Sequence, residues 1–71
     1  MKNTLNFEKG AYVPGEDGAP GTWIIRHFYL ATNIDKPGKG NTWSGSIRLD
    51  GLAEDASDEE IGDAIKAAHG V

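Results

Sequence analysis

Cysteine is absent from this 71-residue chain, so its fold can contain no disulfide bond and no thiolate metal site. The two histidines, His27 and His69, lie far apart in sequence and match no zinc-ligand spacing. Chains this short rarely gain more than about 3–5 kcal/mol from one apolar core without such staples. We therefore expect no metal or other cofactor, and association with a protein partner or a second copy stays open as a source of stability.

Long apolar runs are also missing. No run reaches the roughly 18–20 residues that span a bilayer, and the start MKNTLNFEKG has no continuous apolar core of the kind found in secretory signals. We therefore expect no membrane association and a cytoplasmic location. The length fits one domain over residues 1–71.

Charge is unevenly spread along the chain. The net charge of −4 argues against bulk attraction to nucleic acid. Residues 50–63 contain seven acids and no lysine or arginine, whereas residues 22–52 contain four of the seven basic residues. We expect a molecule with one acidic part and one basic part.

Three segments have the composition of β-strands. Residues 22–32 are rich in β-branched and aromatic side chains, and residues 42–52 alternate between apolar and polar ones. Between them, the Pro37-Gly38 pair favours a type II turn, so the two segments predict one long β-hairpin. Residues 4–13 alternate more loosely around Gly10, which predicts a first strand at a sheet edge with a bulge or turn.

Strict alternation divides residues 22–32 into two faces. One face would hold Trp23, Ile25, His27, Tyr29 and Ala31, and the other Ile24, Arg26, Phe28, Leu30 and Thr32. Both faces are largely apolar, which is typical of a central strand. One face would then be covered by the rest of the chain, and the other covered as well or presented to a partner.

Residues 57–70 predict a helix with both ends marked. Ser57 and Glu60 form a capping box, and the acids after Ser57 suit the positive end of the helix dipole. Gly70 fits the position that follows the helix. An apolar stripe runs along it through Ile61, Ala64, Ile65 and Ala68. The predicted fold is a small α+β domain: a three-stranded antiparallel sheet in β–β–β–α order, with this C-terminal helix packed on one face.

The hairpin tip has the most distinctive local sequence. KPGKG at 36–40, followed by SIRLDGL at 46–52, resembles the tip hairpin in the first domain of the elongation factor P family. The resemblance implies that Lys39 would act at the ribosome, as the matching lysine does in that family. It covers only these short segments, and we do not infer membership. No GxxxxGK[ST] pattern precedes a helix, so the tip is not a phosphate-binding P-loop.

Nothing in the chain predicts catalysis, because no nucleophile motif is present and the acid pairs lie at an exposed helix start. We predict a non-catalytic protein-binding module, an accessory or inhibitor protein of a larger complex, of the kind that phages and mobile elements encode. The predicted contact residues are Trp23, His27, Tyr29, Lys36 and Lys39. Two alternatives stay open: RNA or ribosome binding through the basic tip, and mimicry of nucleic acid by an acidic surface. The residues of that acidic surface are Glu54, Asp55, Asp58 and Glu59.

Overall fold

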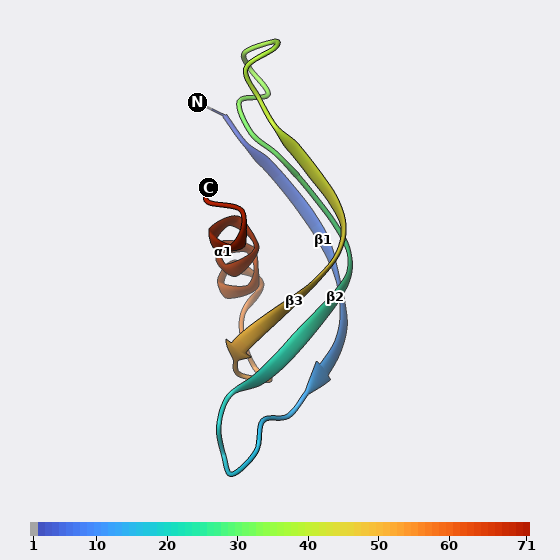
Figure 1. Cartoon of the computed structure of the whole chain (residues 1–71), viewed down its shortest axis with the longest axis vertical. Helices are drawn as coiled ribbons and strands as arrows, with labels where there is room; N and C mark the ends of the chain where they lie inside the picture. The colour runs from blue at the N-terminus through green and yellow to red at the C-terminus, as the bar shows by residue number, and fades with distance from the viewer. Residues whose placement is uncertain (1) are drawn as a thin grey trace.

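The computed structural model of the protein, which describes residues 2–71, has the β–β–β–α order that the sequence predicts. The elements are β1 (Thr4–Val13), β2 (Gly21–Ala31), β3 (Thr42–Leu52) and α1 (Asp58–Ala68). The three strands form one antiparallel sheet with β2 in the centre. The strands bow, and α1 lies on the concave side of the sheet (Figure 1). The predicted small α+β fold with a single C-terminal helix is confirmed.

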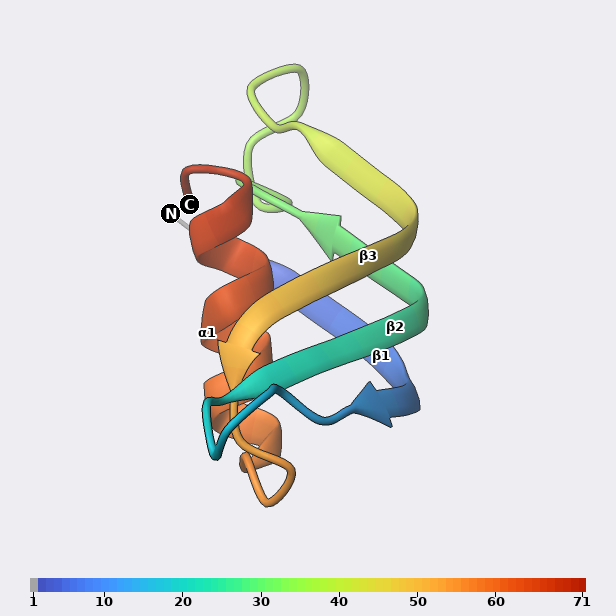
Figure 2. The same cartoon turned by 60° about the horizontal axis from the view of Figure 1, so that its bottom comes forward.

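A line of irregular pairing crosses the middle of the sheet. Gly10 of β1 has no residue opposite it on β2, because Lys9 pairs with Ile25 and Ala11 with Ile24. The pairing of β2 with β3 shifts between Ile25 and Phe28. An extra residue in one strand bends that strand and increases its twist. We therefore attribute the bow of the sheet around α1, which Figure 2 shows from a second direction, to these bulges.

The core lies between the concave face of the sheet and the apolar stripe of α1. Its largest fully buried side chains are Ile25, Leu30, Ile61 and Ile65. Ala64 of the predicted stripe is half-buried, and Ala68 at the helix end is exposed. Gly62, which the stripe did not include, is buried, and a Cβ added there would lie 3.3 Å from Cδ2 of Leu5. The absence of a side chain at this position lets α1 approach β1 closely.

The bulge in β2 changes which side chains share a face. Trp23 and Ile25 precede it, Phe28 and Leu30 follow it, and all four belong to the core that α1 covers. Strict alternation predicted opposite faces for these two pairs. That prediction is wrong, because one extra residue in a strand shifts the order of its side chains by one position.

Trp23 is a core residue, with 9% of its surface exposed. Its Nε1 donates to the carbonyl oxygen of Ala53 over 2.9 Å, and its ring lies 5.4 Å from that of Tyr12. The hydroxyl of Tyr12 accepts from the amide of Gly21 over 2.9 Å and donates to the carbonyl of Leu52 over 3.2 Å. Buried Trp and Tyr rings usually need partners for their polar atoms. Here those partners tie the β3–α1 connection to β1 and β2.

The ends of α1 lie where the sequence predicts them. Oγ of Ser57 accepts from the amide of Glu60 over 3.1 Å, and Gly70 has a φ of 73°. In a capping box the Glu60 carboxylate would also accept from the backbone amide of Ser57. In the structure it accepts from the Ser57 hydroxyl instead, over 3.4 Å. Local side-chain chemistry therefore defines this helix independently of the sheet.

Candidate functional site

No helix of the described residues lies over the convex face of the sheet, opposite α1 (Figure 1). We use this name for the outward side chains around the middle of β2 and its neighbours. In the strand register, Tyr29 lies between Asn6 and Ser44, and His27 lies opposite Glu8. These side chains are exposed, and Tyr29 keeps 45% of its surface accessible on the central strand. Tyr29 keeps this exposure on a central strand because no segment of residues 2–71 folds over it.

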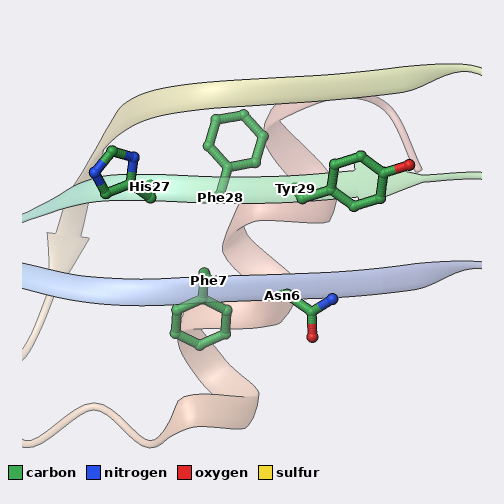
Figure 3. Close-up of a pocket in the computed structure, with 5 residues that line it drawn as sticks. All are labelled: Asn6, Phe7, His27, Phe28 and Tyr29. Atoms are coloured by element: carbon green, nitrogen blue, oxygen red, sulfur yellow. The ribbon is translucent and has the colours of Figure 1, made fainter.

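A shallow hollow of about 250 Å³ lies between β1 and β2, lined by Asn6, Phe7, His27, Phe28 and Tyr29. Figure 3 shows His27 and Tyr29 on either side of Phe28 along β2, with α1 behind the two strands. Asn6 and Phe7 border the hollow from β1. A hollow this open suits one protruding side chain of a partner better than an enclosed small molecule.

The side chains exposed at the hollow combine one aromatic ring with few polar atoms. Tyr29 supplies that ring, because Phe7 and Phe28 turn their rings towards the core that α1 covers, and polar groups come from the Tyr29 hydroxyl, the Asn6 carboxamide and the His27 ring. Tyrosine is enriched at the centres of protein interfaces because its ring gives contact area and its hydroxyl a hydrogen bond. The arrangement can hold an apolar group and orient it by one or two polar contacts.

The structure divides the five predicted contact residues among three places. His27 and Tyr29 lie together on the convex face, as predicted. Trp23 lies in the core on the opposite side of the sheet, so the prediction that it shares the face of His27 and Tyr29 is wrong. Lys36 and Lys39 are exposed in the loop beyond the end of β2.

Asn6 and the two phenylalanines were not predicted as part of a site. Their place beside Tyr29 depends on the register between β1 and β2, which pairs Asn6 with Tyr29 and Phe7 with Phe28. Matching alternation in the segments 4–8 and 28–31 is the only sequence signal of this pairing, and it does not fix a register. The hollow is therefore a product of tertiary pairing.

The tip loop, residues 32–41, forms one end of the molecule (Figure 1). The amide of Lys39 donates to the carbonyl of Lys36 over 3.1 Å, and Gly38 between them has a φ of 77°. Both features agree with the type II turn that Pro37-Gly38 predicts. The two lysines therefore flank a tight turn and extend from it into solvent.

The acidic residues of the alternative site lie near the end of the molecule away from the tip loop (Figure 1). Glu54, Asp55, Asp58 and Glu59 are all exposed. Asp58 forms an ion pair with Nζ of Lys9 over 2.9 Å, and the same Nζ lies 5.4 Å from the ring centre of Trp23. Asp58 thus has a structural contact, whereas Glu54, Asp55 and Glu59 lie in solvent at the start of α1 and before it.

Comparisons with known proteins add no function: no family model, curated protein or solved structure matches the chain. Within residues 2–71 there is no cluster of three or more His, Asp or Glu side chains suited to a metal ion. The described part of the chain also contains no helix with the length and apolarity needed to cross a membrane. The geometry of the convex face and the tip loop is therefore the basis for a functional proposal.

Proposed function

We propose that this protein is a non-catalytic binding module that docks to a protein partner through its convex face. The observation that carries the proposal is Tyr29, 45% exposed on the central strand beside an apolar hollow. Its small size and net charge of −4 fit an accessory or inhibitor protein of a larger complex, such as those that phages and mobile elements encode.

Two further features support docking at this face. The neighbours of Tyr29 across the sheet, Asn6 and Ser44, are short and polar, so the ring rises above its surroundings. An aromatic anchor surrounded by weakly contributing polar side chains is the usual arrangement of an interface hot spot. The strand edges are less suited to adding a partner strand, because bulges interrupt their regular pairing pattern.

The test begins with a photo-crosslinking amino acid at position 29, used in the native host to capture the partner covalently. Affinity for the purified partner is then measured for Tyr29→Ala. We expect a loss of at least about 2 kcal/mol, or roughly thirtyfold in the dissociation constant. Circular dichroism and urea unfolding should show that the variant keeps its fold.

Val13→Ala is the matched control, because Val13 is similarly exposed, at 46%, but lies at the far end of β1. This variant should bind the partner within about threefold of the wild-type affinity. Equal affinities for the wild type and Tyr29→Ala would contradict docking at the convex face. Equal losses in both variants would show that the partner contacts a surface much larger than the hollow.

The tip loop supports a second candidate, RNA or ribosome binding, because Lys36 and Lys39 are exposed and flank one hydrogen-bonded turn. Lys36→Ala combined with Lys39→Ala should abolish such binding, and the wild-type affinity should fall steeply with salt. Binding that is insensitive to salt and to the double variant would reject this candidate.

Nucleic-acid mimicry by the acidic end is tested separately. Alanine at Glu54, Asp55 and Glu59 removes the acids that have no ion-pair contact and leaves the Lys9–Asp58 pair intact. If the protein inhibits a nucleic-acid enzyme by mimicry, the triple variant should lose inhibition while the tip variants keep it. Undiminished inhibition by the triple variant would exclude mimicry.

A further inference from the structure

A larger cavity, of about 430 Å³, lies at the tip-loop end of the molecule, between the loop and the C-terminal end of α1. Its volume falls within the usual range of small-molecule sites. The lining residues that matter here are Asn3, Thr32, Asn33, Asn41, Trp43 and His69, and we call it the asparagine cavity. They come from the start of the chain, the base of the tip loop, the start of β3 and the end of α1. None belongs to the hollow on the convex face.

Hydrogen bonds hold the polar side of this cavity in place. The amide of Asn33 donates to Oδ1 of Asn3 over 3.2 Å, and Nδ2 of Asn33 donates to the carbonyl of Lys39 over 3.3 Å. Across the base of the loop, the amide of Thr32 donates to the carbonyl of Asn41 over 2.9 Å, and the amide of Asn41 donates to Oγ1 of Thr32 over 3.0 Å. A site that is ordered before binding loses less entropy when a ligand arrives.

Aromatic rings form the opposite side. The ring of His69 lies 5.1 Å from that of Trp43 and 5.3 Å from that of Phe28. Nδ1 of His69 is 2.8 Å from the carbonyl oxygen of Ile65. Because that oxygen can only accept, Nδ1 carries the hydrogen of this contact. The His69 ring is thus fixed in place, and with Trp43 it gives the cavity an aromatic wall.

The polar side chains available to a ligand are those of asparagine, threonine and histidine, and Gly70 and Val71 complete the lining. No lysine, arginine, aspartate or glutamate lines the cavity. The bonds above use Oδ1 of Asn3 and the backbone of Asn41, which leaves the amide nitrogen of Asn3 and the whole side chain of Asn41 for a ligand. A carboxamide both donates and accepts, as a hydroxyl group does. An anionic ligand would find no lysine or arginine here, and a wholly apolar ligand would leave these groups unpaired.

We propose that the asparagine cavity binds a neutral saccharide of about disaccharide size. The C–H face of a sugar ring is apolar and packs against an aromatic ring, whereas its hydroxyl groups need partners that donate and accept. Trp43 and His69 supply the aromatic surface, and Asn3 and Asn41 supply the donors and acceptors. The proposal is independent of protein docking at the convex face.

The test is an NMR titration of the ¹⁵N-labelled full chain with maltose, cellobiose, lactose and diacetylchitobiose, each to about 10 mM. At least one should shift the Trp43 indole N–H and the Asn41 side-chain amide saturably, with a dissociation constant in about the millimolar range. The Trp23 indole, which is bonded to Ala53 in the core, should not move. Single Trp→Phe variants assign the two indole signals.

Asn41→Ala should weaken this binding about tenfold, because it removes a carboxamide that donates to and accepts from the saccharide hydroxyls. The variant should keep its fold, because Asn41 is exposed and its side chain holds no part of the fold. Ser44→Ala, three residues further on in β3, is the control, since Ser44 does not line the cavity, and it should bind as the wild type does. The proposal is overturned if no disaccharide gives saturable shifts, or if the Trp23 signal moves as much as that of Trp43. Saturable binding of adenosine or inorganic phosphate in place of any saccharide overturns it equally.

Discussion

The two faces of the sheet differ in what covers them, although the same three strands build both. On the concave face, α1 closes over apolar side chains that include Ile25 and Leu30, neither of which is exposed to solvent. On the convex face, Tyr29 lies among polar neighbours and keeps 45% of its surface. Burial of apolar area supplies most of the stability of a small domain. The comparison therefore assigns most of the stability to the concave face and leaves the side chains of the convex face in solvent.

Adjacent residues on β2 give the strongest test of this division. Phe28 is 7% exposed and faces α1, whereas Tyr29 faces outward. Phe28→Ala should cost about 3–5 kcal/mol in the free energy of unfolding, because it leaves a cavity in the core. Tyr29→Ala should change this free energy by less than about 0.5 kcal/mol. Urea unfolding followed by circular dichroism measures both.

Phe28→Ala could unfold so small a domain altogether, so Phe28→Leu is the milder companion. It keeps most of the apolar volume and should give a folded protein with a lower urea midpoint than Tyr29→Ala. If the tyrosine variant were the less stable of the two, the assignment of these residues to opposite faces would be wrong.

The sequence predicted the elements of this fold better than their faces. Ser57, Glu60 and Gly70 mark the helix by local chemistry, which needs no knowledge of the sheet. The faces of β2 were predicted wrongly because alternation assumes an unbroken strand. Arg26 and His27, two consecutive polar residues between apolar ones, were the available signal of the bulge.

Gly10 provides the second test, because it is the residue of β1 that has no partner on β2. A Cβ added there would collide with the carbonyl oxygen of Ile24 and lie 2.9 Å from Cγ of Arg26. Gly10→Ala should therefore destabilise the protein by about 1–3 kcal/mol, as overpacking does. Ala11→Ser, a change at an exposed neighbour, should have little effect on the urea midpoint. Similar midpoints for the two variants would show that β1 can shift its register without loss.

The candidate site was predictable only in part, for a related reason. Tyr29 and His27 were found from residue type, since aromatic and basic side chains within a strand indicate contact surfaces. The hollow beside them needs the pairing of Phe7 with Phe28. The asparagine cavity joins Asn3, Asn41 and His69 across the whole length of the chain. No local pattern encodes contacts of such sequence separation.

The third test concerns the N-terminal cap of α1, the helix that covers the concave face. Ser57→Ala removes the oxygen that accepts from the amide of Glu60. The loss should be about 1 kcal/mol in the free energy of unfolding. Ser46→Ala, at an exposed position on β3, is the matched change and should stay within about 0.5 kcal/mol of the wild type. A Ser57 variant as stable as the Ser46 variant would mean that packing alone holds the helix start.

The smallest expected effect is at Lys9, which connects the edge of β1 to the start of α1. Its Nζ pairs with Asp58 over 2.9 Å, but the Asp58 side chain is 80% exposed, so water and salt screen the pair. Lys9→Gln should lower the free energy of unfolding by less than about 0.5 kcal/mol, and the difference should shrink further in about 1 M sodium chloride. Lys9→Met separates the charge from the aliphatic chain that passes Trp23, because it keeps the apolar stem and loses the ion pair. The opposite result would be a large, salt-independent loss in the free energy of unfolding for Lys9→Gln that Lys9→Met restores. That result would show that the aliphatic chain of Lys9 belongs to the apolar core, so that the covered concave face extends to the edge of β1.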